Sequence, residues 1–248
     1  MNGGPDGSRE GQAAPIRSQE RFCVIVPGYN EGKCIGEVVR GIREHCPDVV
    51  VVDDGSTDNT AAEAEAVGAH VLKHETNRGK GIALESGFRY AVEQGYAFVV
   101  TMDADGQHDP ADVSALVEEY ARSGKPVIIG SRMDRAENMP LVRRLTNRFM
   151  SWLLSREMKQ HVPDTQSGFR LYRADVLGML ATESRGYAAE SECLLRLAAN
   201  GIEIGSVPIR VIYGNEESSI NPFKDTCRFF RMLGKWRREN GRTPAGNK

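Results

Sequence analysis

The sequence lacks a long apolar stretch and any regular pairing of cysteines. None of its apolar runs approaches the roughly 18 to 20 residues that a membrane-spanning helix requires, and the longest are short and strand-like, such as residues 49–52. Its five cysteines are odd in number, widely spaced and never arranged as C-x-x-C, which argues against a disulfide framework and a zinc site. These absences favour a protein of the reducing cytoplasm that does not span a bilayer.

The sequence also lacks a large excess of either charge. Its 32 basic and 34 acidic residues give a formal net charge of -2, whereas a protein that coats nucleic acid needs a broad excess of Lys and Arg over the phosphates. We therefore expect no nucleic-acid partner. The basic residues gather at the C-terminus, where residues 224–248 hold eight Lys and Arg against two Asp and Glu, a local net charge of +6.

Three segments differ in composition. Residues 1–20 are Gly-rich and polar without an apolar centre, so they fit neither a signal peptide nor a folded element, and we expect a disordered leader. Residues 21–220 carry the pattern of one large folded domain. Residues 221–248 are expected to form a basic amphipathic helix and tail.

From residue 22 onward, short runs rich in β-branched residues alternate with longer amphipathic stretches. This alternation predicts an α/β fold, with a mainly parallel central sheet and helices on both of its faces. Strands are expected at residues 22–26, 49–52, 70–74, 97–102 and 127–130, and helices near residues 33–45, 58–67, 80–94 and 112–122. Asp109 and Pro110 predict the start of the fourth helix, as its cap and its first helical residue.

The regular alternation stops after Arg132. An amphipathic helix is expected over residues 141–156, with four apolar residues at helical spacing: Leu141, Leu145, Phe149 and Leu153. A helix around residues 190–192, a strand near residues 204–213 and a last helix after Asn221-Pro222 complete the expected elements.

Polar side chains gather in the loops that follow the first four predicted strands. In an open α/β sheet, ligands bind at the carboxyl ends of the strands, so these loops should meet at one edge. No G-x-G-x-x-G follows the first strand, and Gly79-Lys80 lacks the upstream Gly and the following Ser or Thr of a P-loop. A dinucleotide dehydrogenase and a P-loop kinase are therefore disfavoured.

The Asp103-x-Asp105 pair is the candidate metal site. Two carboxylates leaving one strand, with Gly106 permitting a tight turn and Gln107 as a further oxygen ligand, suit Mg²⁺ or Mn²⁺ held partly by substrate phosphates. The alternative is that both carboxylates merely cap the loop. Their position after a buried strand favours the metal.

Other residues at the strand ends suit a nucleotide. Asp58 suffices as the cap of the second helix, so the cap does not explain the presence of Asp53 and Asp54. Either carboxylate could accept a hydrogen bond from a base N–H or a ribose hydroxyl, as could Glu31. Lys80 either contacts a phosphate or only begins a helix, and the sequence leaves both interpretations open.

Six motifs in chain order resemble the family-2 glycosyltransferases of the GT-A fold. They are VPGYNE at 26–31, VDDGSTD at 52–58, NRGKG at 77–81, MDADGQH at 102–108, GSR at 130–132 and SGFR at 167–170. More narrowly, the chain looks like the polyprenyl-phosphate sugar transferases, such as the dolichyl-phosphate mannose synthases, over about residues 21–232. Each motif alone is weak, but six in order are specific.

The resemblance implies a Rossmann-like GT-A domain that takes a nucleotide-sugar donor, GDP-mannose or a UDP-sugar. It further implies Mg²⁺ or Mn²⁺ as cofactor and an inverting transfer to a polyprenyl phosphate, dolichyl or undecaprenyl. By position, the nucleoside would be held by Pro27, Tyr29, Glu31 and one of Asp53 or Asp54, with Lys80, Asp103 and Ala104 also on the donor side. The metal ligands would be Asp103, Asp105 and Gln107.

The same resemblance assigns the acceptor side. Arg132 would contact the acceptor phosphate and Ser167 would lie near the transferring sugar, so that Asp105, Arg132 and Ser167 are the candidate catalytic residues. Some relatives carry a basic residue where this chain has Pro163. A second acceptor arginine would then be missing, or supplied by Arg170 or Arg210.

The nature of the acceptor decides whether a general base is needed. A phosphate monoester is already mostly dianionic at pH 7, so it needs cations and no base. A family-2 transferase acting on a hydroxyl, in polysaccharide or glycolipid synthesis, is the alternative, with Glu190 or Glu192 as base. Both glutamates could instead form a solvated helix face or pair with an arginine. A binding protein with a dead site is disfavoured by the intact metal motif.

The C-terminal helix is the candidate membrane contact. It interleaves apolar and basic residues: Phe223, Cys227, Phe230, Met232 and Leu233 with Lys224, Arg228, Arg231 and Lys235. Either it lies on anionic lipid, or it packs on the domain with a solvated basic side. Many relatives append membrane-spanning helices at this point, so the resemblance implies a peripheral protein at the cytoplasmic face or a separate membrane subunit.

Overall fold

Seven strands in the described part of the chain form one mixed sheet. The computed structural model describes residues 20–133, 139, 141–180, 187–212 and 222–240. The strands are β1 (Phe22–Gly28), β2 (Val49–Asp53), β3 (His70–Lys73), β4 (Phe98–Thr101), β5 (Val127–Ser131), β6 (Arg170–Arg173) and β7 (Ile204–Pro208). Their order is β3-β2-β1-β4-β6-β5-β7, and all neighbours are parallel except that β6 is antiparallel to β4 and β5.

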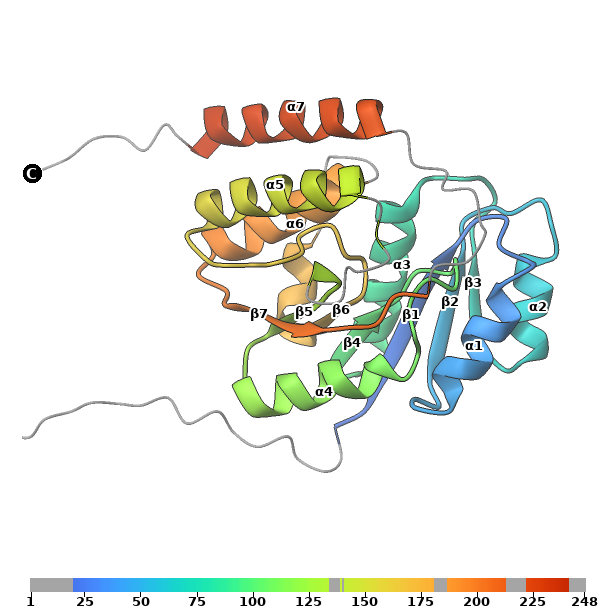
Figure 1. Ribbon diagram of the computed structural model, residues 1–248. Coiled ribbons are helices and arrows are strands. Elements are labelled where there is room, and N and C mark those ends of the chain that lie inside the picture. The colour runs from blue at the N-terminus through green and yellow to red at the C-terminus, as the bar shows by residue number, and fades with distance from the viewer. Residues whose placement is uncertain (1–19, 134–138, 140, 181–186, 213–221, 241–248) are drawn as a thin grey trace, which may run out of the picture.

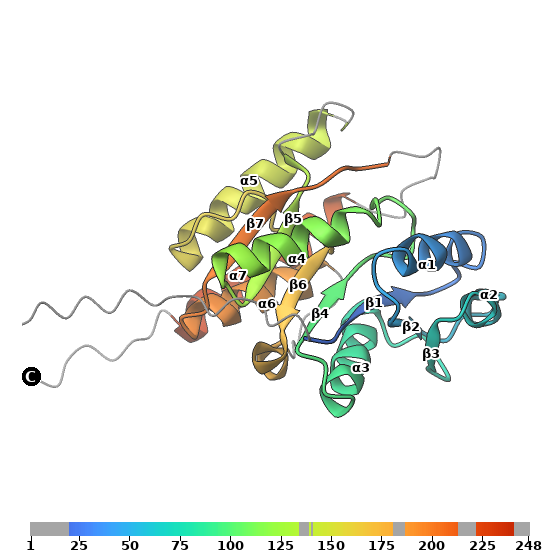
Figure 2. The same ribbon diagram turned by 90° about the horizontal axis from the view of Figure 1, so that it is seen from below.

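Helices cover both faces of the sheet (Figures 1 and 2). They are α1 (Ile35–Arg43), α2 (Thr60–Ala66), α3 (Lys80–Glu93), α4 (Asp112–Ser123), α5 (Leu141–Met158), α6 (Tyr187–Ala199) and α7 (Pro222–Asn240), with a 3₁₀ helix at Ala174–Met179. Residues of α1, α2 and α4 share one apolar cluster with the sheet, and residues of α3, α5, α6 and α7 share the other. The predicted α/β class is confirmed.

Alternation along each strand explains how one sheet supports two cores. Successive side chains of a strand point to opposite faces. In β1, Val24 and Val26 belong to the cluster under α1, while Cys23 and Ile25 belong to the cluster under α3. The strands are therefore apolar on both faces, which suits a sheet with helices on both sides.

The four predicted strand–helix units at the start of the domain are confirmed, with small differences at their ends. Helix α4 begins at Asp112, so Pro110 is not its first residue; Asp109 Oδ1 instead accepts from the Ala111 N–H at 3.0 Å in the turn before it. The strand expected near residues 204–213 ends at Pro208. Strand β6 was not predicted from the sequence; it pairs Arg170 with Thr101 at the end of β4.

The apolar residues of α5 and α7 differ in how far they are buried. Phe229, Met232 and Leu233 of α7 are buried, which matches the packing interpretation for that side of the helix. On α5, by contrast, Leu141, Leu145 and Phe149 are exposed.

Within the described residues, none of the helices combines the length and the apolar character needed to cross a membrane. The predicted leader lies outside the described residues, apart from Glu20, and so do the side chains of Phe223 and Lys224.

Candidate active site

Hydrogen bonds tie the loops after β1 and β2 into one corner of the carboxyl edge. Asn30, at a φ of +58°, accepts at Oδ1 from the Thr57 N–H at 2.9 Å, and its own N–H donates to Ser56 Oγ at 2.9 Å. The corner contains the nucleoside residues predicted from the first motif: Pro27, Tyr29 and Glu31. Pro27 is buried, whereas the Tyr29 ring is 44% exposed and open to a ligand.

Asp53 and Asp54 are both buried but have different surroundings. Asp53 Oδ1 accepts from the Ser56 N–H at 2.9 Å. Asp53 Oδ2 has no hydrogen-bond partner among the described residues and lies 4.0 Å from Lys73 Nζ. Because an unpaired carboxylate oxygen at 1% exposure is costly, a ligand N–H would stabilise it. Of the two aspartates, Asp53 is the one with capacity to accept from a nucleoside.

Asp54 instead holds the loop that leads into α3. Its carboxylate accepts from the Gly79 N–H at 2.6 Å and from the Arg78 N–H at 3.0 Å, and it contacts His74 Nδ1 at 2.6 Å. Gly79 has a φ of +94°, which an L side chain rarely adopts. The loop conformation places Lys80 at the first turn of α3, facing the sheet edge.

Lys80 joins two carboxylates from distant parts of the chain. Its Nζ lies 2.6 Å from Asp103 Oδ1 and 2.6 Å from Glu190 Oε1. Burial alone would lower the pKa of Lys80, but these two charges raise it, so the ammonium stays protonated. Burial would raise the pKa of Asp103, yet Lys80, His108 and Arg132 lower it to about 2. Asp103 is therefore ionised at neutral pH.

The segment before β6 passes unusually close to Asp103. A Cβ on Gly168 would lie 2.9 Å from both Asp103 carboxylate oxygens and from Lys80 Nζ, so a larger residue would have to displace these charged groups. Thr101 Oγ1 fixes the approach by donating to the Gly168 carbonyl at 2.8 Å. Because β6 runs antiparallel to β4, the residues that precede it sit at the carboxyl edge of β4.

Arg132 and Asp164 form a buried ion pair beside this cluster. Arg132 Nε donates to Asp164 Oδ2 at 2.7 Å and Nη2 donates to Oδ1 at 3.0 Å, a two-point contact. Burial would raise the pKa of Asp164, but the Arg132 charge and hydrogen bonds lower it. Arg132 is near enough to Asp103 to help lower the pKa of that carboxyl as well. The pair orients the guanidinium at the edge of the site.

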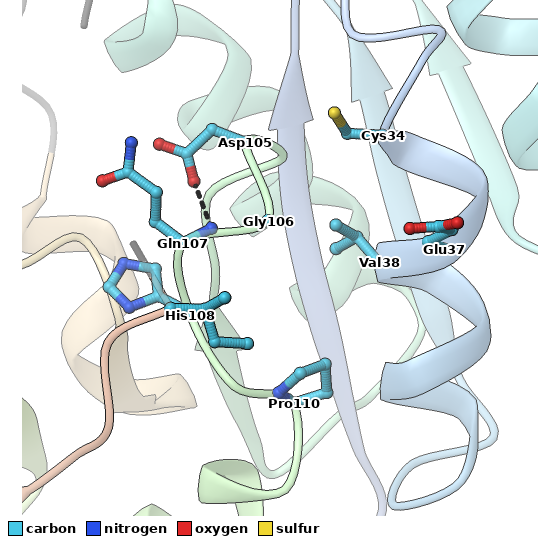
Figure 3. A pocket seen from close by; sticks show the side chains of 9 residues that line it. Cys34, Glu37, Val38, Asp105, Gly106, Gln107, His108 and Pro110 are labelled. Carbon is cyan, nitrogen blue, oxygen red and sulfur yellow. Dashed lines mark hydrogen bonds between the residues drawn. The ribbon is translucent and has the colours of Figure 1, made fainter. Parts of the chain in front are cut away.

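Residues Asp105 to His108 of the loop after β4 line a pocket of about 280 Å³ against α1 (Figure 3). Asp105 Oδ1 accepts from the Gln107 N–H at 3.0 Å, which shapes the loop. Ala104 is buried in the core. Burial lowers the pKa of His108 to about 4 against the opposing charge of Asp103, so the imidazole is neutral at pH 7.

The donor set of this loop suits a hard divalent cation. Asp103, Asp105 and Gln107 offer carboxylate and amide oxygens, the ligand types that Mg²⁺ and Mn²⁺ prefer. The described residues contain no cluster of three or more His, Cys, Asp or Glu that could hold a metal by itself. Asp103 and Asp105 would supply only part of the coordination shell of a cation. Substrate phosphates and water would then supply its remaining ligands.

Three residues predicted for the acceptor side lie in different environments. Each guanidinium nitrogen of Arg170 is hydrogen-bonded, to acceptors on Ser167, Tyr172, Thr165 and Glu190. Arg210 is held by Asp109 and Asp112 at the start of α4. Ser167 is fully buried, and its Oγ accepts from the Phe169 N–H at 3.4 Å. The guanidinium of Arg170 is thus engaged by contacts within the domain, and Arg132 is the better-placed candidate for the acceptor side.

Two residues of the site were not assigned a role from the sequence. His74 supports Asp54 from 20 positions away, and Asp164 supports Arg132 from 32 positions away. The only available signal was the position of Asp164 at the start of the D-x-x-S-G stretch, and it does not identify Arg132 as the partner.

Comparison with known proteins identifies related sequences over most of the chain. The model of the family described as "Glycosyl transferase family 2" matches residues 23–180. The UDP-N-acetylglucosamine–dolichyl-phosphate N-acetylglucosaminyltransferase of Methanococcus voltae is 34% identical over 213 residues, covering 77% of this chain and 85% of the relative. The polyprenol monophosphomannose synthase of Mycolicibacterium smegmatis is 32% identical over 214 residues, covering 79% of each chain.

Solved structures share the fold. The glucosyl-3-phosphoglycerate synthase of Mycobacterium tuberculosis, solved with Mn²⁺, UDP and glucosyl-3-phosphoglycerate, superposes with a TM-score of 0.66 at 22% identity. The similarity covers 92% of this chain and 82% of that one. At this level of identity the match supports the architecture of the sheet and helices, and no residue role is taken from it.

Proposed function

The chain belongs to glycosyl transferase family 2, and we propose that it transfers a sugar, with inversion, from a nucleotide-sugar donor to a polyprenyl phosphate, assisted by a divalent cation. The names of the two relatives support the acceptor class, since one acts on dolichyl phosphate and the other makes polyprenol monophosphomannose. We propose that the enzyme works as a peripheral protein at the cytoplasmic face of the membrane, alone or with a separate membrane subunit.

The pairing of the two candidate bases is the observation that carries the choice of a phosphate acceptor. Glu190 is held by Lys80 at 2.6 Å and contacts Arg170 at 3.5 Å. Glu192 Oε1 accepts from Arg196 at 2.7 and 2.9 Å. A hydroxyl acceptor needs a base within hydrogen-bond reach of its proton, whereas a phosphate dianion needs none. Because both glutamates are already paired with cations, neither is placed as a free base, and this arrangement favours a phosphate acceptor.

The donor would lie along the edge from β2 to β4. Asp53 would accept an N–H of the base through its unpaired Oδ2, and the Tyr29 ring would cover the nucleoside. Lys80 would turn its ammonium toward the diphosphate, with Glu190 holding its side chain in place. A cation bound by Asp103 and Asp105 would neutralise charge on the leaving nucleoside diphosphate without any proton transfer.

On the acceptor side, Arg132 would orient the lipid phosphate. Its guanidinium is fixed by Asp164, so it meets the phosphate with little further loss of conformational freedom. The attacking phosphate oxygen is already charged, and positioning it opposite the leaving group is the main task of the protein.

Transfer of radiolabelled sugar to undecaprenyl phosphate tests the proposal. UDP-glucose, GDP-mannose and UDP-N-acetylglucosamine are each offered with Mn²⁺ or Mg²⁺, beside an Asp105→Ala variant and a metal-free control. We expect one donor to give a labelled lipid that depends on metal and on Asp105. If no donor labels the lipid while one is slowly hydrolysed, the acceptor proposal is wrong and a hydroxyl acceptor becomes the leading hypothesis.

A further inference from the structure

Helix α5 exposes a set of large apolar side chains to solvent. Their exposed fractions are 68% for Leu141, 76% for Val142, 59% for Leu145, 51% for Phe149 and 57% for Trp152. The Phe149 and Trp152 rings stack on one another with centroids 6.0 Å apart. Scattered exposed apolar residues are ordinary, but a contiguous set of five on one helix marks a contact surface.

The five side chains lie on one side of the helix. At about 100° per residue, their directions fall within an arc of about 100°. The opposite side of α5 is already packed, because Met150, Leu154 and Met158 belong to the apolar cluster shared with α6 and α7. The helix therefore has two apolar faces, and only one of them is covered by the described part of the protein.

Basic residues accompany the exposed face. Arg148 and Arg156 are exposed on the same helix, with Arg144 partly exposed. The only acidic residue of α5, Glu157, is bound by Arg237 of α7. The face therefore combines a tryptophan, a phenylalanine and aliphatic side chains with arginines for which no ion pair is found in the part of the chain that the structure describes. This composition is that of an interfacial helix on anionic lipid, since a second protein surface would need no such charge bias.

The covered side of α5 is hydrogen-bonded to the loop of residues 162–165. Ser151 Oγ accepts from the Thr165 N–H at 2.9 Å, and Ser155 Oγ accepts from the Val162 N–H at 3.0 Å. The loop held in this way carries Asp164, the partner of Arg132. Docking of the outer face of α5 would therefore bring the loop that positions Arg132 next to the surface on which α5 rests.

We propose that the exposed face of α5, defined by Leu141, Val142, Leu145, Phe149 and Trp152, docks on an anionic lipid bilayer, with the two aromatic rings at the depth of the headgroups. We place the contact on α5 and not on α7, because Phe229, Met232 and Leu233 of α7 are buried in the domain and Phe230 is its one large apolar side chain exposed among the described residues. The inference rests on the proposed function, because docking on a bilayer would bring the enzyme to its lipid phosphate acceptor. Its test measures vesicle binding and does not require catalytic activity.

Trp152 provides a direct probe, because the chain has two tryptophans and the other is Trp236. A Trp236→Phe variant leaves Trp152 as the only indole. We expect its fluorescence to shift to the blue on vesicles of phosphatidylglycerol and phosphatidylcholine, to be quenched by brominated acyl chains, and to respond far less to pure phosphatidylcholine. An unshifted and unquenched Trp152 on the anionic vesicles overturns the proposal.

A matched pair of variants tests the face itself. In the Trp236→Phe background, Leu145→Gln with Phe149→Gln should lower vesicle partitioning at least about tenfold. Val92→Gln, on α3 and 54% exposed, should leave it unchanged. Melting temperatures equal to that of the Trp236→Phe parent exclude misfolding, and they are expected because Leu145, Phe149 and Val92 are exposed.

If the double variant binds vesicles as the parent does, the face is not the membrane contact. A dimer in light scattering that the double variant abolishes, without a change in vesicle binding, would assign the face to a second copy and refute the proposal. Vesicle binding that depends on α5, in a protein that labels no lipid, would leave the docking proposal standing and count against the proposed function alone.

Discussion

Replacing Asp53 by Asn should weaken nucleotide binding without weakening the fold. The Asp53→Asn side chain can still accept from the Ser56 N–H through its carbonyl, so the loop after β2 keeps its hydrogen bond. Its amide group would then stand where Oδ2 lacks a partner. An amide there donates instead of accepting, so it faces the N–H of the bound base with the wrong polarity.

The size of the effect follows from the loss of one hydrogen bond to a charged group. Such a bond contributes about 1.5 to 3 kcal/mol, which corresponds to an increase in Kd of about 10- to 150-fold. The free energy of unfolding should stay within about 1 kcal/mol of the parent or rise, because a buried charge with an unpaired oxygen has been removed. Calorimetric titration with UDP and GDP, and urea unfolding of the nucleotide-free protein, measure the two quantities.

Asp54→Asn is the matched control at the next position. Asp54 accepts from Gly79 and contacts His74, so this variant should lose about 2 to 3 kcal/mol of stability through weakened hydrogen bonds to a charged group. Equal nucleotide affinity of Asp53→Asn and the parent would refute the assignment of the nucleoside contact. So would a fall in affinity in Asp54→Asn with unchanged stability.

Three further outcomes follow from the site. Asp105→Asn should abolish the stimulation of lipid labelling by Mn²⁺ while the melting temperature stays near that of the parent. Glu190→Gln should keep kcat within about tenfold of the parent, whereas a general base would lose about 10² to 10⁴; a loss in that range contradicts the phosphate acceptor. The pKa of Asp164 is lower in the folded protein than in the unfolded chain. Its contribution to stability is therefore present above the unfolded pKa of about 3.9 and is lost as pH falls below it. Asp164→Asn should destabilise the fold by about 3 to 5 kcal/mol at pH 7, because Arg132 is left buried and unpaired, and urea unfolding at pH 7 and pH 3 should show this difference shrinking with acid.

The first half of the fold was predictable because its signals are local. Apolar runs such as Val49–Asp53, each followed by an amphipathic stretch, specify strands and helices whose parallel order brings their end loops to one edge. The strand β6 carries no comparable signal in its four residues, RLYR. It is formed by pairing with β4 and β5, and that pairing depends on contacts far apart in the sequence.

The site was predictable in its residue types and less so in their partners. The sequence placed Lys80, Asp103 and the Asp53-Asp54 pair at the edge, but it could not show which aspartate is committed to holding a loop. That distinction depends on His74, a residue of another loop. The helical spacing in α5 likewise predicted an apolar line through Leu141, Leu145 and Phe149. It did not show that the other side of the helix, with Met150 and Leu154, would be the side packed on the domain.

The balance of charge at the site explains why a metal cofactor suits it. Among the described residues, the cations at the diphosphate and acceptor side are Lys80, Arg132 and Arg170, and the carboxylates are Asp103, Asp105, Asp164 and Glu190. His108 adds no charge, because its pKa is lowered to about 4. The four carboxylates exceed the three cations before any substrate arrives. The proposed substrates, a sugar nucleotide and a lipid phosphate, would both bring further negative charge, which the described residues alone would repel. A divalent cation held by the oxygen ligands of the Asp103–Gln107 loop would offset this charge.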